Sequence, residues 1–160
     1  VVEELHLQGH LSIEMPKIGC MIEMPSAVMS IRSIANASDF LSIGTNDLIQ
    51  YSLGVERSDT ILHRHFHPVH PSILRMIAVV IKECTLQGKP LSICGELASS
   101  SLVLPLLIGL GIREISCAPL YIPLVKRTIR NLSYREAARQ AQKALALTTS
   151  LEIRELILNF

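Results

Sequence analysis

Short apolar runs alternate with helix-like segments along the whole chain. Four runs have the character of strands, near residues 18–23, 40–44, 91–95 and 112–117. Their residues are apolar throughout rather than alternating, which predicts strands that are buried on both faces. Helical periodicity separates the four runs, so we expect an α/β fold with a parallel sheet in which a helix connects each strand to the next.

The expected helices carry start and stop signals. Apolar spacing predicts one helix from Ser26 through Ala35, and Pro71 and Gly88 bracket a longer one. Pro105 must kink the helix expected over 101–110 or shift its start. The last three helices begin at a proline or at a hydroxyl residue followed three positions later by Glu, namely at Pro123, Ser133 and Thr149.

Four strand–helix units fit two architectures. An open, doubly wound sheet suits 160 residues. A (β/α)₈ barrel needs eight units and usually about 250 residues, so this chain would supply half of one. The hydrophobic pattern by itself does not choose between them.

Composition narrows the class of protein. Hydrophobic residues make up 49% of the chain and charged residues 18%, which is typical of a folded globular domain. A net charge of +1 and 4% aromatic residues argue against nucleic acid as a partner. The longest apolar run, Leu102 to Ile112, is too short for a membrane span. Four widely spaced cysteines indicate a reducing, cytoplasmic compartment.

Polar side chains follow the predicted strands, at the edge where parallel sheets bind ligands. Glu23 follows the first strand and Asp47 the second. Neighbouring strands lie about 4.8 Å apart, so two such carboxylates can share one cation. Mg²⁺ suits them, because it takes few protein carboxylates and completes its shell with water and substrate oxygens. The alternative is that Glu23 pairs with an arginine and that Asp47 caps the helix beginning there.

Three further groups are candidates for binding and proton transfer. The turn Gly44–Asp47 offers backbone N–H groups to an anion, and Arg57 could hold a phosphate or carboxylate. Cys94 ends the third strand, and its thiol could protonate an enolate carbon. Cys20 and Cys84 are expected to be small buried hydrophobes, while the place of Cys117 stays open. A solvated loop is favoured over a zinc site for the histidine cluster, which comprises His63, His65, His67 and His70.

Three motifs carry a resemblance to a known family. The stretch from Asp39 to Arg57 resembles the second signature of the PEP-utilising enzymes. Ile18 to Pro25 (IGCMIEMP) and Ile93 to Ala98 (ICGELA) resemble two further family motifs in the expected order. Within the family, ICGELA and His67 to Arg75 are most similar to the Enzyme I branch of the bacterial sugar phosphotransferase system. Ser116 to Pro123 is also similar to pyruvate phosphate dikinase.

The resemblance implies roles for individual residues. Glu23 and Asp47 match the family's Mg²⁺ ligands, and Asn46, Asp47 and Arg57 match its phosphoenolpyruvate contacts. Cys94 matches the catalytic proton donor that converts the enolate to pyruvate. The resemblance also implies a TIM-type barrel, of which residues 18–160 would be the C-terminal half, with four parallel βα units plus C-terminal helices. Residues 1–17 would then be the remnant of a preceding barrel helix or loop.

The resemblance further implies a phosphotransferase in which a histidine of another domain accepts the phosphoryl group. We expect that domain to be missing, because the chain begins with Val and none of its histidines lies in the family's acceptor motif. The chain alone is therefore expected to be inactive. The implied partners are the phosphocarrier protein HPr and a second copy in a homodimer. The alternatives are a piece of pyruvate phosphate dikinase or PEP synthase, and a non-catalytic dimerisation or regulatory module.

Overall fold

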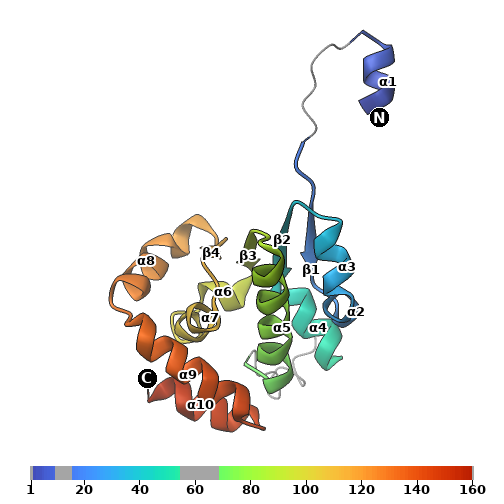
Figure 1. Cartoon of the computed structure of the whole chain (residues 1–160). Helices are drawn as coiled ribbons and strands as arrows, with labels where there is room; N and C mark the ends of the chain where they lie inside the picture. The colour runs from blue at the N-terminus through green and yellow to red at the C-terminus, as the bar shows by residue number, and fades with distance from the viewer. Residues whose placement is uncertain (1, 10–15, 55–68, 160) are drawn as a thin grey trace.

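A four-stranded parallel sheet organises the fold (Figure 1). The computed structural model describes residues 2–9, 16–54 and 69–159. The strands lie in the order β1-β2-β3-β4, and every neighbouring pair is parallel. Their bounds are β1 Gly19–Ile22, β2 Phe40–Gly44, β3 Leu91–Cys94 and β4 Glu114–Ile115. The predicted α/β class and parallel sheet are confirmed, although β4 is shorter than expected.

Only one face of the sheet is covered by the described residues. Ile22, Ile43 and Ile93 share a register and are fully buried against helices of the core. The residue before each of them in the strand lies on the opposite face, where Met21 is 49% exposed and Ser42 and Ser92 are half-buried. Among the described residues the strands are therefore buried on one face, and not on both as predicted. The apolar runs of β2 and β3 are interrupted by Ser42 and Ser92, and both serines face away from the helices.

Ten α-helices lie in the part of the chain that the structure describes, and nine of them follow β1. The longest, α5, runs over Pro71–Gln87 and ends at Gly88 in the left-handed conformation with φ 64°, as the sequence predicted. The others are α1 Val2–Leu7, α2 Pro25–Met29, α3 Ile31–Asn36, α4 Thr45–Leu53, α6 Glu96–Ser99, α7 Leu104–Leu110, α8 Ile122–Arg130, α9 Tyr134–Ala146 and α10 Ser150–Leu158.

Two expectations about the helices need correction. The single helix expected from Ser26 to Ala35 is divided at Ser30 into α2 and α3. The short helix α6 was not expected. Of the two outcomes expected for Pro105, the structure shows the shifted start: the helix expected over 101–110 begins at Leu104 in α7, with Pro105 in its first turn, where a missing N–H group costs no hydrogen bond.

The capping signals of the last two helices are realised to different extents. Thr149 and Glu152 form a complete capping box at the start of α10. At the start of α9, the Ser133 hydroxyl accepts the backbone N–H of Glu136, but the Glu136 carboxylate accepts hydrogen bonds from Arg139 and Gln140 instead of returning to the cap. The bidentate arginine therefore competes with the second half of the box.

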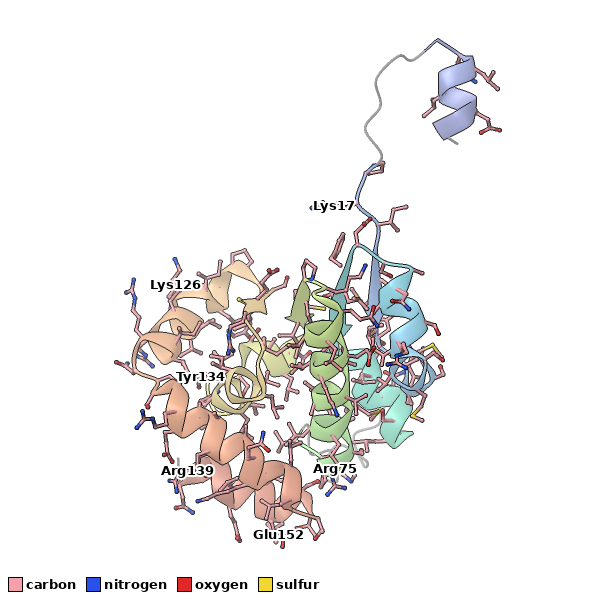
Figure 2. All side chains as sticks on the ribbon, in the orientation of Figure 1. Lys17, Arg75, Lys126, Tyr134, Arg139 and Glu152 are labelled. Atoms are coloured by element: carbon pink, nitrogen blue, oxygen red, sulfur yellow. The ribbon has the colours of Figure 1, made fainter. Side chains whose placement is uncertain are left out.

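The C-terminal helices attach to the sheet layer through α5 and α7. Gly109 of α7 lies so close to the backbone of Ala137 in α9 that a Cβ at this position would overlap the Ala137 carbonyl. The Arg75 guanidinium of α5 donates to the carbonyl oxygens of Leu145 and Leu147, at 3.3 and 2.9 Å (Figure 2). These contacts hold α9 against the helices that cover the sheet.

Candidate functional site

The polar residues singled out in the sequence lie at the carboxyl ends of three adjacent strands. Glu23 directly follows β1, Asp47 lies in the first turn of α4 after β2, and Cys94 is the last residue of β3. Because the three strands are parallel neighbours, these ends form one edge of the sheet. The register pairs Gly44 with Cys94 across β2 and β3.

The Glu23 and Asp47 carboxylates do not have the structural roles considered as alternatives to metal binding, which were an ion pair with an arginine and a helix cap. In the ranges that the structure describes, neither Glu23 nor Asp47 forms an ion pair, and Asp47 makes no capping hydrogen bond. Glu23 Oε2 lies only 2.9 Å from the place that a Cβ on Gly44 would occupy. The glycine therefore leaves room for the Glu23 carboxylate beside the end of β2.

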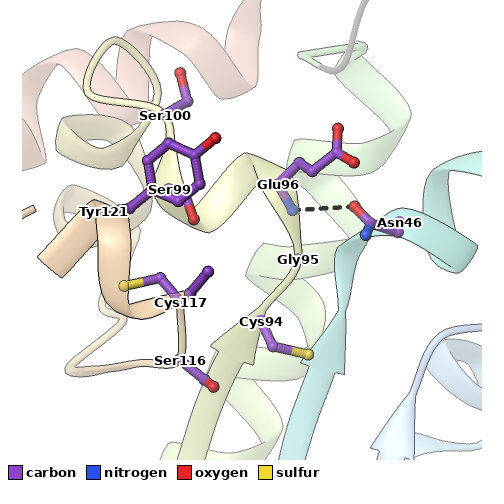
Figure 3. A pocket seen from close by; sticks show the side chains of 10 residues that line it. Asn46, Cys94, Gly95, Glu96, Ser99, Ser100, Ser116, Cys117 and Tyr121 are labelled. Atoms are coloured by element: carbon purple, nitrogen blue, oxygen red, sulfur yellow. Dashed lines mark hydrogen bonds between the residues drawn. The ribbon is translucent and has the colours of Figure 1, made fainter.

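A hydrogen-bonded junction joins the ends of β2 and β3. The buried Thr45 hydroxyl donates to the Cys94 carbonyl oxygen at 2.8 Å, and the Asn46 Oδ1 accepts the backbone N–H of Glu96 at 3.0 Å (Figure 3). Gly95 has φ 100°, and a Cβ there would overlap the Thr45 hydroxyl. Asn46 thus uses its carbonyl oxygen within the protein and keeps its amide N–H groups as donors.

Sequence reasoning placed Thr45 and Gly95 at the strand ends but predicted no role for either of them in the site. Thr45 stood out only as part of a turn, and its partner lies 49 residues away in the sequence. The signal that was present is the glycine directly after Cys94, because a glycine at a strand end often marks a close backbone approach.

The Cys94 thiol lies on the uncovered face of the sheet, within a short polar chain. Its Sγ lies 3.5 Å from the Ile43 carbonyl oxygen, to which the thiol donates. The Ser42 hydroxyl donates to Cys94 Sγ at 3.9 Å, and the Ser92 hydroxyl donates to Ser42 Oγ at 2.9 Å. A thiol held in this way can give its proton to a group placed above the sheet edge.

The other cysteines have different surroundings. Cys84 is buried in α5 as expected, and burial, with a smaller contribution from Glu83, raises the pKa of its thiol. Cys20 is only half-buried, so its prediction as a buried residue was wrong, because it lies at the edge strand β1. Cys117 is half-buried, and its side chain points away from that of Cys94 (Figure 3).

A cavity of about 670 Å³ opens beside Cys94. The ends of β2 and β3 supply Asn46, Cys94 and Gly95 to its wall, and Ser116 and Tyr121 close the opposite side. Its volume lies within the range of about 300–1,000 Å³ that is usual for small-molecule sites. The cavity therefore gives a small ligand access to the strand ends.

Some predicted site residues fall elsewhere. Arg57, His63, His65 and His67 lie outside the described residues. His70 accepts the backbone N–H of Ser72 and begins α5, so it serves as a helix cap. Across 2–9, 16–54 and 69–159, no three or more His, Cys, Asp or Glu side chains lie together as a group that could hold a metal ion.

Over the same ranges no helix is both long and apolar enough to cross a membrane.

A parallel α/β sheet with carboxylates, an amide and a thiol at its strand ends places polar groups where proteins of this class bind small ligands. The chain matches the family described as "PEP-utilising enzyme, PEP-binding domain" over residues 1–134. It therefore belongs to the PEP-utilising enzyme family, and the region that matches is its PEP-binding domain.

Curated relatives agree with this family. The chain is 39% identical to a phosphoenolpyruvate-protein phosphotransferase of Haemophilus influenzae, over 98% of this chain and 27% of the relative. It is 42% identical to one from Buchnera aphidicola, over 90% of this chain and 25% of the relative. It is also 38% identical to multiphosphoryl transfer protein 2 of Escherichia coli, over 90% of this chain and 17% of the relative. The chain thus spans about a quarter, or less, of these relatives.

Proposed function

We propose that this chain is the PEP-binding and Mg²⁺-binding part of a phosphoenolpyruvate-protein phosphotransferase. The observation that carries the proposal is the placement of Glu23, Asn46, Asp47 and Cys94 at one edge of a parallel sheet, in a chain of the PEP-binding family. In this proposal the enzyme converts phosphoenolpyruvate to pyruvate, and the phosphoryl group passes to a histidine of another domain.

The fold that we propose for the complete domain is a (β/α)₈ barrel, with residues 18–160 as its C-terminal half. The sheet supports this, because helices bury one face while the other carries Ser42, Ser92 and Cys94 without cover from the described residues. A sheet face without cover is what half of a barrel would present, because the interior side chains of a barrel pack against those of the other strands, and the ligand site lies at the carboxyl ends of the strands. Residues 1–17 would belong to the preceding unit.

Glu23 and Asp47 are the residues that would hold Mg²⁺. Both are hard oxygen donors on adjacent strand ends, and both are free of ion pairs in the described part of the chain. Two carboxylates suit an ion that completes its shell with water and substrate oxygens. When bound, Mg²⁺ stabilises the negative charge on the phosphate and enolate oxygens.

The remaining residues would bind and protonate the substrate. Asn46 has amide N–H groups to donate, because its carbonyl oxygen is already held by Glu96, and Arg57 would supply a positive charge. Cys94 would protonate C3 of the enolate: the S–H bond breaks, a C–H bond forms from the enolate double bond, and the electron pair stays on sulfur. The product is pyruvate, and the thiolate regains a proton from water.

The proposal extends to the partners and the compartment. By analogy with the named function of the relatives, we propose HPr as the phosphoryl acceptor downstream, a homodimer as the working assembly and the cytoplasm as the location. The uncovered sheet face, with Met21 49% exposed, supports a need for further polypeptide against this half of the fold.

The test is a chimera in which this chain replaces the matching segment of the Haemophilus influenzae relative. Calorimetry then measures the binding of PEP with and without Mg²⁺. Glu23→Gln and Asp47→Asn should each weaken Mg²⁺-dependent binding by about tenfold or more, which corresponds to a loss of at least ~1.4 kcal/mol. Glu114→Gln is the matched control, because Glu114 lies within β4 and not at the carboxyl-terminal edge. Equal effects of all three substitutions, or binding without Mg²⁺, would contradict the proposal.

A further inference from the structure

We propose that Ser92 is a positioning residue for Cys94 and that it acts through the hydroxyl of Ser42. This inference rests on the proposed function, in which the Cys94 thiol protonates the enolate carbon. Ser92 donates its hydrogen bond to Ser42 and does not line the cavity beside Cys94, so its role would be to orient the hydroxyl that donates to the sulfur.

The geometry is a chain of two hydroxyls that ends on the sulfur. The Ser92 hydroxyl donates to Ser42 Oγ at 2.9 Å, and the Ser42 hydroxyl donates to Cys94 Sγ at 3.9 Å. Ser42 and Ser92 are register partners on the neighbouring strands β2 and β3, and Cys94 lies two residues beyond Ser92 on the same face. The strand pairing therefore fixes all three side chains together.

The direction of the hydrogen bonds gives Ser92 its effect. A serine hydroxyl has one hydrogen to donate and two lone pairs that accept. Because Ser92 donates to Ser42, it occupies a lone pair of that oxygen and leaves the Ser42 hydrogen for the sulfur. Without Ser92, the Ser42 hydroxyl can turn toward water, and the sulfur loses its donor for part of the time.

This donor matters at the moment when the thiol gives up its proton. The thiol donates to the Ile43 carbonyl at rest, and that bond is lost when the S–H bond breaks. The Ser42 hydroxyl then faces a thiolate, and a hydrogen bond to a charged acceptor is stronger than one to a neutral acceptor. The serine pair would thus stabilise the product of the proton transfer, and Ser92 would keep the pair in place.

The experiment measures how fast iodoacetamide alkylates each cysteine of the purified chain, with peptide mass spectrometry as the readout. The rates are measured from pH 6 to pH 9 at intervals of about one pH unit, because the thiolate is the form that reacts. Ser92→Ala should slow the alkylation of Cys94 by about threefold to tenfold, the factor that corresponds to one ordinary hydrogen bond. Ser42→Ala should have the same effect, and the double variant should be no slower than either single one.

Matched variants separate positioning from a packing effect. Thr and Val have nearly the same shape, so Ser92→Thr should keep the alkylation rate of Cys94 near that of the parent, while Ser92→Val should lower it as Ser92→Ala does. Ser116→Ala is the control from the same cavity, because Ser116 donates no hydrogen bond to this chain of hydroxyls. The buried Cys84 reports unfolding, and it should stay unreactive in every variant.

An unchanged Cys94 rate in Ser92→Ala and Ser92→Val, with a lowered rate in Ser42→Ala, would overturn the inference. A rate in Ser92→Thr as low as in Ser92→Val would overturn it too, because packing would then explain both. These rates are measured without PEP, so they stand apart from the PEP-binding test of the proposed function. If the chimera does not bind PEP while Ser92→Ala still slows the alkylation of Cys94, the proposed function is contradicted and the positioning role of Ser92 is not.

Discussion

Gly95 is the position where one added methyl group should disturb the site most. Its backbone has φ 100°, a region that residues with a Cβ rarely adopt, and a methyl group there would overlap the Thr45 hydroxyl and lie 3.0 Å from Asn46 Oδ1. Thr45 is fully buried and bonded to the Cys94 carbonyl, so it has little freedom to move away. Gly95→Ala should therefore strain the backbone and also break the junction between β2 and β3.

The cost can be estimated from these two terms. Backbone strain at a position with positive φ contributes about 1–2 kcal/mol. Displacing Thr45 costs a buried hydrogen bond and forces repacking, which adds about 1–3 kcal/mol. The expected loss in the free energy of unfolding is therefore about 2–5 kcal/mol. Gly88→Ala is the control for a glycine with positive φ and free space, because Gly88 has no atom within 4 Å of the added Cβ. Its ψ of 27° lies in the left-handed helical region, where an added Cβ costs about 1–2 kcal/mol and no more than it costs at Gly95 with ψ 179°.

Urea unfolding followed by circular dichroism measures both variants under the same conditions. Thr45→Ala in the Gly95→Ala background removes the overlapping hydroxyl, so the double variant should lose less stability than the sum of the two single ones. If Gly95→Ala costs no more than Gly88→Ala, or if the two substitutions add independently, the close approach of Thr45 to Gly95 is wrong.

Three further outcomes follow from the packing and the charges. Gly109→Ala should cost about 1–3 kcal/mol of unfolding free energy, because its Cβ overlaps a backbone carbonyl of α9 that cannot rotate away, and urea unfolding checks this. Arg75→Ala should cost about 1–2 kcal/mol and Arg75→Lys nearly as much, since lysine has one nitrogen atom in place of the planar fork whose Nε and Nη2 reach the carbonyls of Leu145 and Leu147. Hydrogen bonds from the Thr149 hydroxyl, and from backbone N–H groups of Thr149 and Thr148, hold the pKa of Glu152 below its ordinary value. The charged Glu152 therefore stabilises the fold fully above its unfolded-state pKa of about 4.3, and this stabilisation is lost as the pH falls through the lower folded-state pKa. Glu152→Gln removes the titrating group, so the Tm of this variant should fall less steeply with decreasing pH below about 4.3.

The sequence predicted the elements whose signals are local. The apolar runs of β2 and β3 indicated strands, and Pro71 suits the first turn of a helix because it has no N–H group to leave unbonded. Gly88 and Thr149 end or begin helices through hydrogen bonds to residues three or four positions away. Each of these interactions needs only neighbours in the chain, so the pattern of residue types was enough to place them.

Features that depend on contacts between distant residues were not predictable. Ser42 and Ser92 look like minor interruptions of apolar runs, and only the pairing of β2 with β3 shows that they share a face with Cys94. The bond from Thr45 to the Cys94 carbonyl joins two strand ends that no local spacing connects. The candidate residues themselves were found because they follow strands, but the groups that hold them came only from the structure.

The central claim is that Cys94 protonates PEP-derived enolate at this strand edge, and Cys94→Ala in the chimera tests it most directly. One calorimetric titration gives the Kd for PEP, and an assay of pyruvate release gives the rate, with Cys117→Ala as the control from the same cavity. The account predicts that pyruvate formation falls by about 10²–10⁴-fold, the usual contribution of a general acid, while the Kd for PEP stays close to that of the parent. An equal loss of affinity and rate, or full pyruvate formation without the thiol, would contradict it.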